Sequence, residues 1–177
     1  METICHGGAA STWYWRSCSR DALIPARLFI SGGTDTQRLS PSGSVYVSVP
    51  EPGRYESTVY HGSGQKTAQV IQQSFARHAR RVVSGRGPEF FQQALATARE
   101  RNVDYLVYPS IIHWEERATE WSGIPDRVEV KIEVVDVDSE RTLQSGIIEG
   151  ESAVMTFGGR PEELLPEPIG KFVSAAY

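Results

Sequence analysis

The sequence predicts an α+β fold, with a mixed, largely antiparallel sheet and helices packed mainly on one face. Residues 44–50 (SVYVSVP) alternate apolar and polar side chains, which is the period of a half-buried strand. Two segments with apolar residues three or four positions apart follow, and this is the helical period. Alternating runs then fill residues 103–156. The order is therefore β-α-(β)-α-β-β-β-α, and helices that come early with hairpins that come late favour this class.

The first strand is expected at residues 44–49, with Val45, Val47 and Val49 on one face and Pro50 at its end. The part before it has turn residues and no apolar period. We therefore assign residues 1–43 to an irregular N-terminal segment or linker and residues 44–177 to a single α+β domain.

Helical segments are expected in three parts of the chain. The first covers residues 67–79, where Ala68, Ile71, Phe75 and Ala79 form one apolar stripe. The second begins near Pro88 and closes at Asn102 in a left-handed cap. Near the end of the chain, Pro166 and Pro168 are expected to break a short helix. A last helical stripe then consists of Ile169, Phe172, Val173 and Ala176.

The most strand-like run is residues 104–116, which are rich in aromatic and β-branched side chains. Pro109 has no N–H to donate to a neighbouring strand, so a bulge or bend is expected there. Beyond it, Ile112 and Trp114 should lie on one face of the strand. His113 and Glu115 alternate with them on the other face.

Three further strands are expected. Residues 81–85 are expected to form a short strand between the first two helices. Residues 128–134 alternate apolar and charged side chains, as in an antiparallel strand with one wet face. A turn follows, and residues 143–156 return as a strand that is interrupted at Gly146 and Gly150.

Composition excludes several function classes. The net charge of −4 over 177 residues argues against a nucleic-acid surface, which needs a basic patch. Cys5 and Cys18 lack the spacing of a zinc site, and no serine stands in a nucleophile motif with patterned His and acid partners. We therefore expect no catalytic residue, no metal and no cofactor, and we predict that the chain is not an enzyme.

Two interpretations of the N-terminal residues stay open. Residues 1–33 are either a genuine unstructured extension or the product of a frame error before Cys18. Tryptophan codons read one base out of phase, after a C, become leucine codons, so the WYWR run at residues 13–16 could hide an apolar signal segment. Cys18 would then be the lipidated first residue of a mature lipoprotein.

Several separated motifs resemble one known family. They are HWEERATEWSG at residues 113–123, VVDV at 134–137, and TFGG followed by LLP at 156–166. They are similar to those of an uncharacterised family of small bacterial lipoproteins, defined as a domain of unknown function and seen mostly in gammaproteobacteria. The resemblance covers about residues 44–177. It implies an envelope protein on the periplasmic face, anchored in the outer membrane through a lipidated cysteine, with no catalytic residues to transfer.

More distantly, the element order resembles two small α/β domains of envelope assembly proteins. These are the Tol protein N-terminal domain and the periplasmic domain of the curli secretion lipoprotein. This likeness concerns the fold and carries no activity.

The richest polar cluster lies in and after the 104–116 run. Its candidate binding residues are His113, Trp114, Glu115, Arg117, Glu120 and Trp121. A histidine among carboxylates could serve acid–base or metal chemistry. Two tryptophans and an arginine on a hairpin are also typical interface anchors. In the third interpretation, the tryptophans pack across the hairpin and the charges pair in solvent.

We predict a non-enzymatic envelope domain that binds a protein partner or self-associates, with no nucleic acid bound and membrane contact only through a lipid anchor. The alternative is a small-molecule or carbohydrate binder, in which Trp114, Trp121 and the carboxylates form a stacking pocket.

Overall fold

The computed structural model describes residues 27–30, 37–116, 125–152 and 160–177. Its elements follow one another in an order that matches the predicted one, with β1 and the short β3 and β4 added. They are β1 (Arg27–Ile30), β2 (Ser44–Val49), β3 (Arg54–Tyr55), β4 (Thr58–Val59), α1 (Ser63–Phe75), β5 (Arg81–Pro88), α2 (Phe91–Glu100), β6 (Tyr105–Glu115), β7 (Arg127–Asp136), β8 (Thr142–Glu151), the 3₁₀ helix η1 (Pro161–Leu164) and α3 (Pro166–Ala176).

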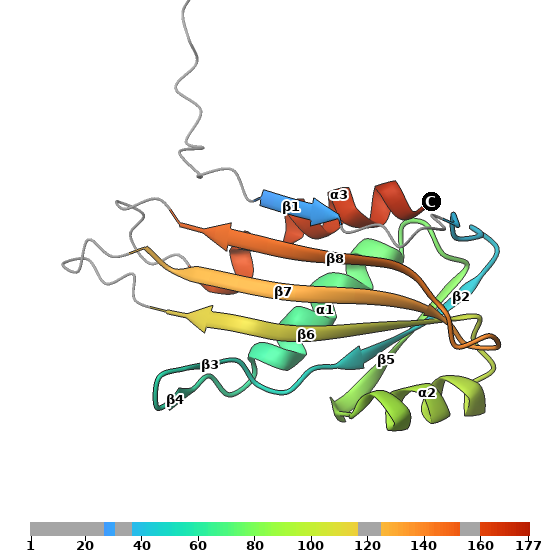
Figure 1. The fold of residues 1–177 in the computed structure, drawn as a ribbon, viewed down its shortest axis with the longest axis horizontal. Coiled ribbons are helices and arrows are strands. Elements are labelled where there is room, and N and C mark those ends of the chain that lie inside the picture. Colours follow the sequence, from blue (N-terminus) through green and yellow to red (C-terminus); the bar gives the residue numbers. More distant parts are fainter. Residues whose placement is uncertain (1–26, 31–36, 117–124, 153–159) are drawn as a thin grey trace, which may run out of the picture.

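The main sheet has six strands in the order β1-β8-β7-β6-β2-β5, and β3 and β4 form a separate hairpin (Figure 1). The β6–β7, β7–β8 and β1–β8 pairs are antiparallel. The central β2 is parallel to both β5 and β6, because α1 and α2 carry the chain back between these strands. The predicted α+β class with a mixed, largely antiparallel sheet is confirmed.

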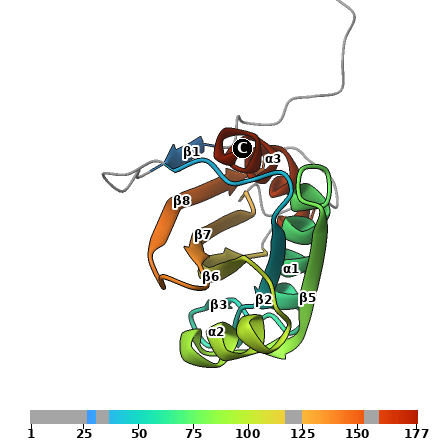
Figure 2. The same cartoon turned by 90° about the vertical axis from the view of Figure 1, so that its right-hand side faces the viewer.

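Two helices cover one face of the sheet and the third covers part of the other (Figure 2). The larger core joins α1 and α3 to the valines of β2 and β7 that were predicted to point inward. The smaller core joins Ala94, Leu95 and Ala98 of α2 to Tyr46 and Leu106 on the opposite face. Within the described ranges, no helix has both the length and the apolar character needed to cross a bilayer.

The first helix starts earlier than predicted. The α1 helix begins at Ser63, not at residue 67, and it ends at Phe75. The Ser63 hydroxyl accepts a hydrogen bond from the Gly53 N–H at 2.7 Å and donates one to the Tyr60 carbonyl at 2.8 Å. Gly62, at φ 89°, supplies the left-handed turn just before the helix. These tertiary contacts set a boundary that the apolar stripe alone does not show.

The prolines also behave differently from the prediction. Pro88 ends the edge strand β5, where a missing N–H is tolerated, and α2 begins at Phe91. The predicted short helix is η1, and it ends at Leu164, before Pro166, as expected. The last helix, however, begins before its apolar stripe, because Pro166 and Pro168 fit its first turn, where the N–H groups need no partner within the helix. By contrast, Asn102 takes the predicted left-handed conformation, at φ 50°.

The long strand β6 has its irregularity at a different place from the one predicted. Pro109 pairs in register with Ile132, and the bulge lies at Ile112, between the pairs formed by Ile111 and His113. The β2 strand pairs with β6 only as far as Val107. Past that point β6 pairs with β7 alone, so a residue without an N–H is tolerated without a bend.

The returning strand β8 is not interrupted at its glycines. It runs from Thr142 to Glu151 through both Gly146 and Gly150. A Cβ atom added at Gly150 would lie 2.7 Å from the Leu164 Cβ. Glycine is needed here because η1 packs directly on the strand backbone.

Candidate functional site

The outer half of β6, β7 and β8 carries a polar surface on the side away from α1 and α3, and we call it the open face. The pairing register places His113, Glu129 and Glu149 in one row across the three strands. Glu115, Arg127 and Glu151 form the next row. Along β7, Arg127 and Glu129 alternate with the fully buried Val128 and Val130. The register and this alternation define the open face by six residues: His113, Glu115, Arg127, Glu129, Glu149 and Glu151.

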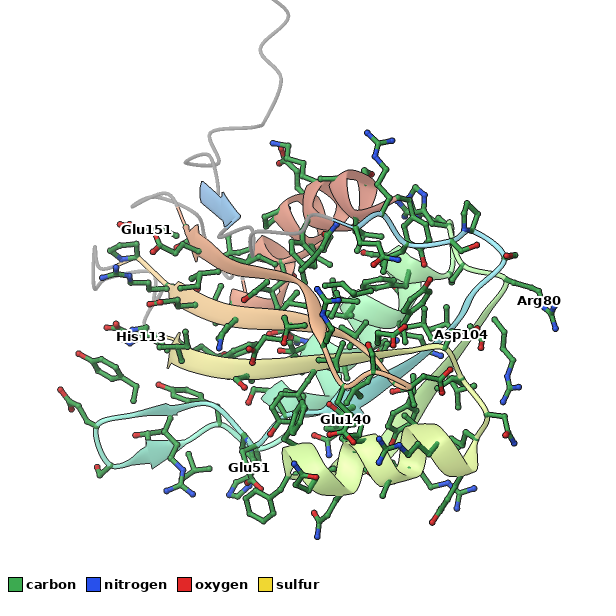
Figure 3. All side chains as sticks on the ribbon, turned by 45° about the vertical axis from the view of Figure 1, so that its right-hand side comes forward. Glu51, Arg80, Asp104, His113, Glu140 and Glu151 are labelled. Atoms are coloured by element: carbon green, nitrogen blue, oxygen red, sulfur yellow. The ribbon has the colours of Figure 1, made fainter. Side chains whose placement is uncertain are left out.

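The open face lies at one end of the sheet. His113 and Glu151 are at that end, whereas Asp104 and Glu140 are at the opposite end (Figure 3). The α2 helix covers this sheet face only near Leu106 and Val135, so it does not reach the outer rows. The β3–β4 hairpin lies beside the same end of β6 (Figure 1).

His113 is held by two contacts. Its Nε2 atom lies 3.0 Å from the Glu115 Oε2 atom, and both side chains are largely buried. Its ring meets the ring of Tyr55 edge to face, with 5.2 Å between centroids and 76° between planes. The Glu116 N–H points to the Tyr60 hydroxyl at 3.5 Å. The hairpin and the segment after β4 therefore fix the imidazole on one side of the open face.

The centre of the open face carries two carboxylates of the same charge. Glu129 and Glu149 stand directly opposite each other on β7 and β8. Lys131, two residues after Glu129 on β7, pairs with Glu133 at 3.0 Å. Among the described residues, neither Glu129 nor Glu149 has an ion-pair partner. Like charges opposite each other on neighbouring strands destabilise a sheet, but the register also places Arg27 of β1 opposite Glu149, so the chain supplies a cation in the same row.

The structure brings together only part of the predicted cluster. His113 and Glu115 lie on the open face, as expected. Ile112, which was expected on the same face as Trp114, is instead 51% exposed while Trp114 is buried, because the bulge at Ile112 interrupts the alternation. Trp114 is 1% exposed and packs in the larger core, where Gly53 lies against it. Its ring is not at the surface, so Trp114 cannot form the wall of the predicted stacking pocket. The remaining candidates are Arg117, Glu120, Trp121 and Cys18, and all lie outside the described residues.

Sequence reasoning did not single out Tyr55, Glu129, Glu149 or Glu151. The wet face of the 128–134 run was recognised, and it contains Glu129. What a sequence does not show is the register that places Glu129 between His113 and Glu149. In the ranges that the structure describes, no three His, Cys, Asp or Glu side chains are grouped so that they could hold a metal ion.

A second polar cluster, under α2, has a structural role. The Tyr46 hydroxyl donates to Glu89 Oε2 at 2.5 Å, and the Thr97 hydroxyl donates to Glu89 Oε1 at 3.0 Å. Burial, and then the neighbouring Glu89 carboxylate, raise the pKa of Tyr46 far above its ordinary value. The phenol therefore stays protonated and fastens the start of α2 to β2.

The fold is shared with PelC, and two lipoprotein structures match it less well. The PelC dodecamer from Paraburkholderia phytofirmans matches with a TM-score of 0.63 and 18% identity, over 86% of this chain and 96% of that chain. Lipoprotein GNA1162 from Neisseria meningitidis matches with a TM-score of 0.46 and 14% identity, over 75% of this chain and 94% of that chain. The LpoB C-terminal domain from Salmonella enterica matches with a TM-score of 0.42 and 14% identity, over 65% of this chain and 85% of that chain. Among curated proteins, no sequence matches this chain.

A family model matches residues 37–175, a range that includes every motif on which the predicted resemblance rested. The predicted membership in a family of unknown function is therefore confirmed, while the lipid anchor and the gammaproteobacterial source are no part of that match. The chain belongs to the family described as Domain of unknown function (DUF4823).

Proposed function

We propose that this chain is a non-enzymatic protein-binding or assembly module of the bacterial cell envelope, and that the open face is the surface that binds the partner. The observation that carries the proposal is the Glu129–Glu149 pair. A like-charged pair of this kind costs a sheet a few tenths to about 1 kcal/mol, and it lies in the row where the register also places Arg27. A cationic group of a partner that docks there would turn this cost into an attraction and would fix the orientation of the partner.

Three further considerations favour this function over others. The motifs shared with bacterial lipoproteins support the envelope location. The PelC structure is a dodecamer, and the match covers 96% of the PelC chain. A second copy of the present chain is therefore the first partner to test. Ile112 is 51% exposed next to His113 and offers an apolar contact at the border of the open face.

The test uses the full chain in cells, with a photo-crosslinking residue introduced at position 112. We expect crosslinked species of defined mass, in which mass spectrometry identifies either a second copy or another envelope protein. The double variant Glu129→Gln/Glu149→Gln keeps the shape of both side chains and removes their charge. It should lose the crosslink and at the same time unfold at higher denaturant concentration, because the repulsion is gone.

The matched control is Glu100→Gln/Glu163→Gln, which makes the same charge change at two exposed carboxylates away from the open face. It should leave both the crosslink and the stability as in the wild type. A glutamine variant that crosslinks like the wild-type chain would remove the open face as the docking surface.

A further inference from the structure

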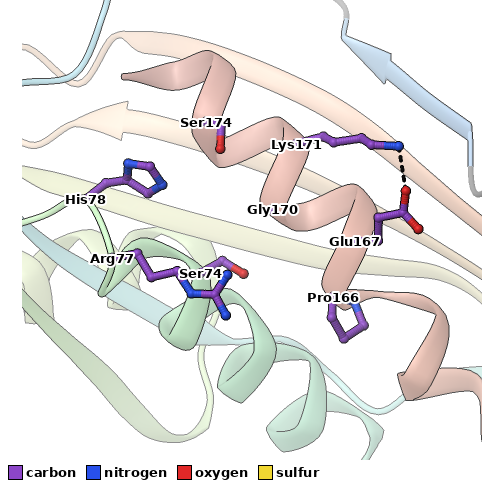
Figure 4. Close-up of a pocket in the computed structure, with 8 residues that line it drawn as sticks. All are labelled: Ser74, Arg77, His78, Pro166, Glu167, Gly170, Lys171 and Ser174. Carbon is purple, nitrogen blue, oxygen red and sulfur yellow. Dashed lines mark hydrogen bonds and ion pairs between the residues drawn. The ribbon is translucent and has the colours of Figure 1, made fainter.

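A groove of about 450 Å³ lies between the end of α1 and the outer side of α3, far from the open face. Figure 4 shows Arg77 and His78 on the α1 side and Lys171 and Ser174 on the α3 side. This volume is within the range of sites that hold small molecules. Its lining is mixed, with slightly more apolar than polar surface, and the charged side chains in it indicate the class of ligand.

The groove is positively charged on a chain whose net charge is −4. Arg77 is exposed, and its guanidinium has no ion-pair partner among the described residues. Lys171 pairs with Glu167 at 2.7 Å, but these side chains are 61% and 68% exposed. An exposed pair of this kind contributes little, so the Lys171 ammonium can turn to another anion at low cost. One arginine, one lysine and one carboxylate, that of Glu167, therefore line the groove, with the Lys171 and Glu167 side chains extending on the side of α3 away from Arg77 (Figure 4).

The neighbouring groups are fixed in place for binding. The His78 ring stacks on the Tyr177 ring, with 5.3 Å between centroids and 16° between planes. This contact holds the imidazole at the edge of the groove, next to Arg77. Ser174 adds a hydroxyl from the α3 side. A guanidinium with a held imidazole and a hydroxyl is a donor set that suits an oxyanion.

Gly170 keeps the groove open. It lies in the interior of α3, where glycine is less favourable than alanine. An added Cβ at this position would meet no atom within 4 Å. No packing constraint therefore requires glycine here, and its effect is to leave the wall of the groove without a side chain.

We propose that this groove binds a small anionic molecule through an oxyanion group, with Arg77 as the principal donor. The Arg77 guanidinium makes two parallel hydrogen bonds to a carboxylate or a phosphate, and Lys171 supplies the second positive charge. The proposal is independent of the open face and of any partner protein.

The test is a titration of the full chain with inorganic phosphate and, separately, with succinate, at low ionic strength, followed by the NMR signals of the His78 ring. At least one probe should shift these signals in a saturable way, and the probe that binds tighter identifies the group. Arg77→Gln should weaken binding roughly tenfold to a hundredfold, as expected for a lost charged hydrogen bond. Gly170→Leu, which fills the groove and keeps its charges, should abolish binding while the circular dichroism spectrum stays unchanged.

The control is Arg86→Gln, which removes an exposed arginine of β5 that does not line the groove. It should bind like the wild type. The proposal is overturned if neither probe shifts the His78 signals, if Arg77→Gln or Gly170→Leu binds as tightly as the wild type, or if Arg86→Gln weakens binding as much as Arg77→Gln.

Discussion

At the scale of single residues, Asp104 fastens the starts of two parallel strands. Its Oδ2 atom accepts hydrogen bonds from the Ser44 N–H at 2.6 Å and from the Ser44 hydroxyl at 2.7 Å. The Asp104 N–H donates to the Ser44 carbonyl at 3.0 Å. The backbone and then the side chain of Ser44 hold the pKa of Asp104 below its usual range, with a smaller contribution from Arg80.

These hydrogen bonds of Asp104 predict that the free energy of unfolding depends on pH. Because the pKa of Asp104 is lower in the folded chain, its contribution is complete above the unfolded value of about 3.9 and is lost as the pH falls through the folded value. Asp104→Ala should lower the free energy of unfolding at neutral pH by about 1 kcal/mol, a modest amount because the group is exposed. The difference from the wild type should shrink below about pH 4.

Urea unfolding of the wild type and of Asp104→Ala at several pH values measures this difference in the free energy of unfolding. The control is Asp138→Ala in the turn between β7 and β8, because Asp138 makes no hydrogen bond or ion pair with the described residues. Its effect should be small at every pH. A loss for Asp104→Ala that stays constant down to acid pH would contradict the role of the ionised carboxylate.

At the scale of elements, the β3–β4 hairpin is positioned by Gly53. The Gly53 N–H donates to the Ser63 hydroxyl at 2.7 Å, and its carbonyl accepts from the Tyr60 N–H at 2.9 Å. Its Cα lies so close to Trp114 that an added Cβ would overlap the Trp114 Cβ and crowd Ile111. The hairpin brings Tyr55 to His113, so this contact also shapes the border of the open face.

Gly53→Ala is therefore expected to destabilise the protein by about 1–3 kcal/mol, as for an overpacked core. The added methyl group should push the hairpin away from β6 and loosen the Tyr55–His113 contact. The matched variant Gly87→Ala adds a methyl where nothing lies within 4 Å, and it should be near neutral. Thermal unfolding of both variants, together with the NMR line width of His113, tests the prediction. Equal effects of the two alanines would show that the close approach to Trp114 does not matter.

Periodicity predicted those elements that bury one face and expose the other. The alternation of Val128 and Val130 and the stripe of Ile71 and Phe75 hold in the structure because burial on one face sets both patterns. Boundaries were less predictable. The α1 helix starts at Ser63 because of hydrogen bonds to Gly53 and Tyr60, and these residues are distant from the stripe.

The candidate site was predictable only in part. His113 and Glu115 were found because they alternate with buried residues on one strand. Glu149 reaches the same surface through the register of β7 and β8, and pairing partners leave no local trace in the sequence. Trp114 was assigned to a binding surface on residue type alone, whereas Gly53 and the larger core enclose it.

At the scale of the whole molecule, the two cores lie on opposite faces of the same strands. Val45, Val47 and Val107 belong to the larger core, and their neighbours Tyr46 and Leu106 belong to the smaller one. Because both cores share these strands, unfolding the strands of one core also exposes the side chains of the other. The described domain should therefore unfold as one cooperative unit.

Leu95→Ala, in the smaller core, tests this coupling. Leu95 is 1% exposed, and its truncation should lower the free energy of unfolding by about 2–5 kcal/mol. Hydrogen exchange should then show the same loss of protection in the most protected amides of α1, on the far face of the sheet, as in α2. If α1 keeps wild-type protection while α2 loses it, the two faces unfold separately.

The early end of the β2–β6 pairing has a consequence for the behaviour of the protein in concentrated solution. Beyond Val107, β6 presents a strand edge that no other strand of the main sheet covers on that side. Such edges can recruit strands of other molecules and start aggregation. Pro109 removes one donor from this edge, and the bulge at Ile112 breaks its regular spacing. Both features make this edge of β6 a poorer template for pairing with a strand of another molecule.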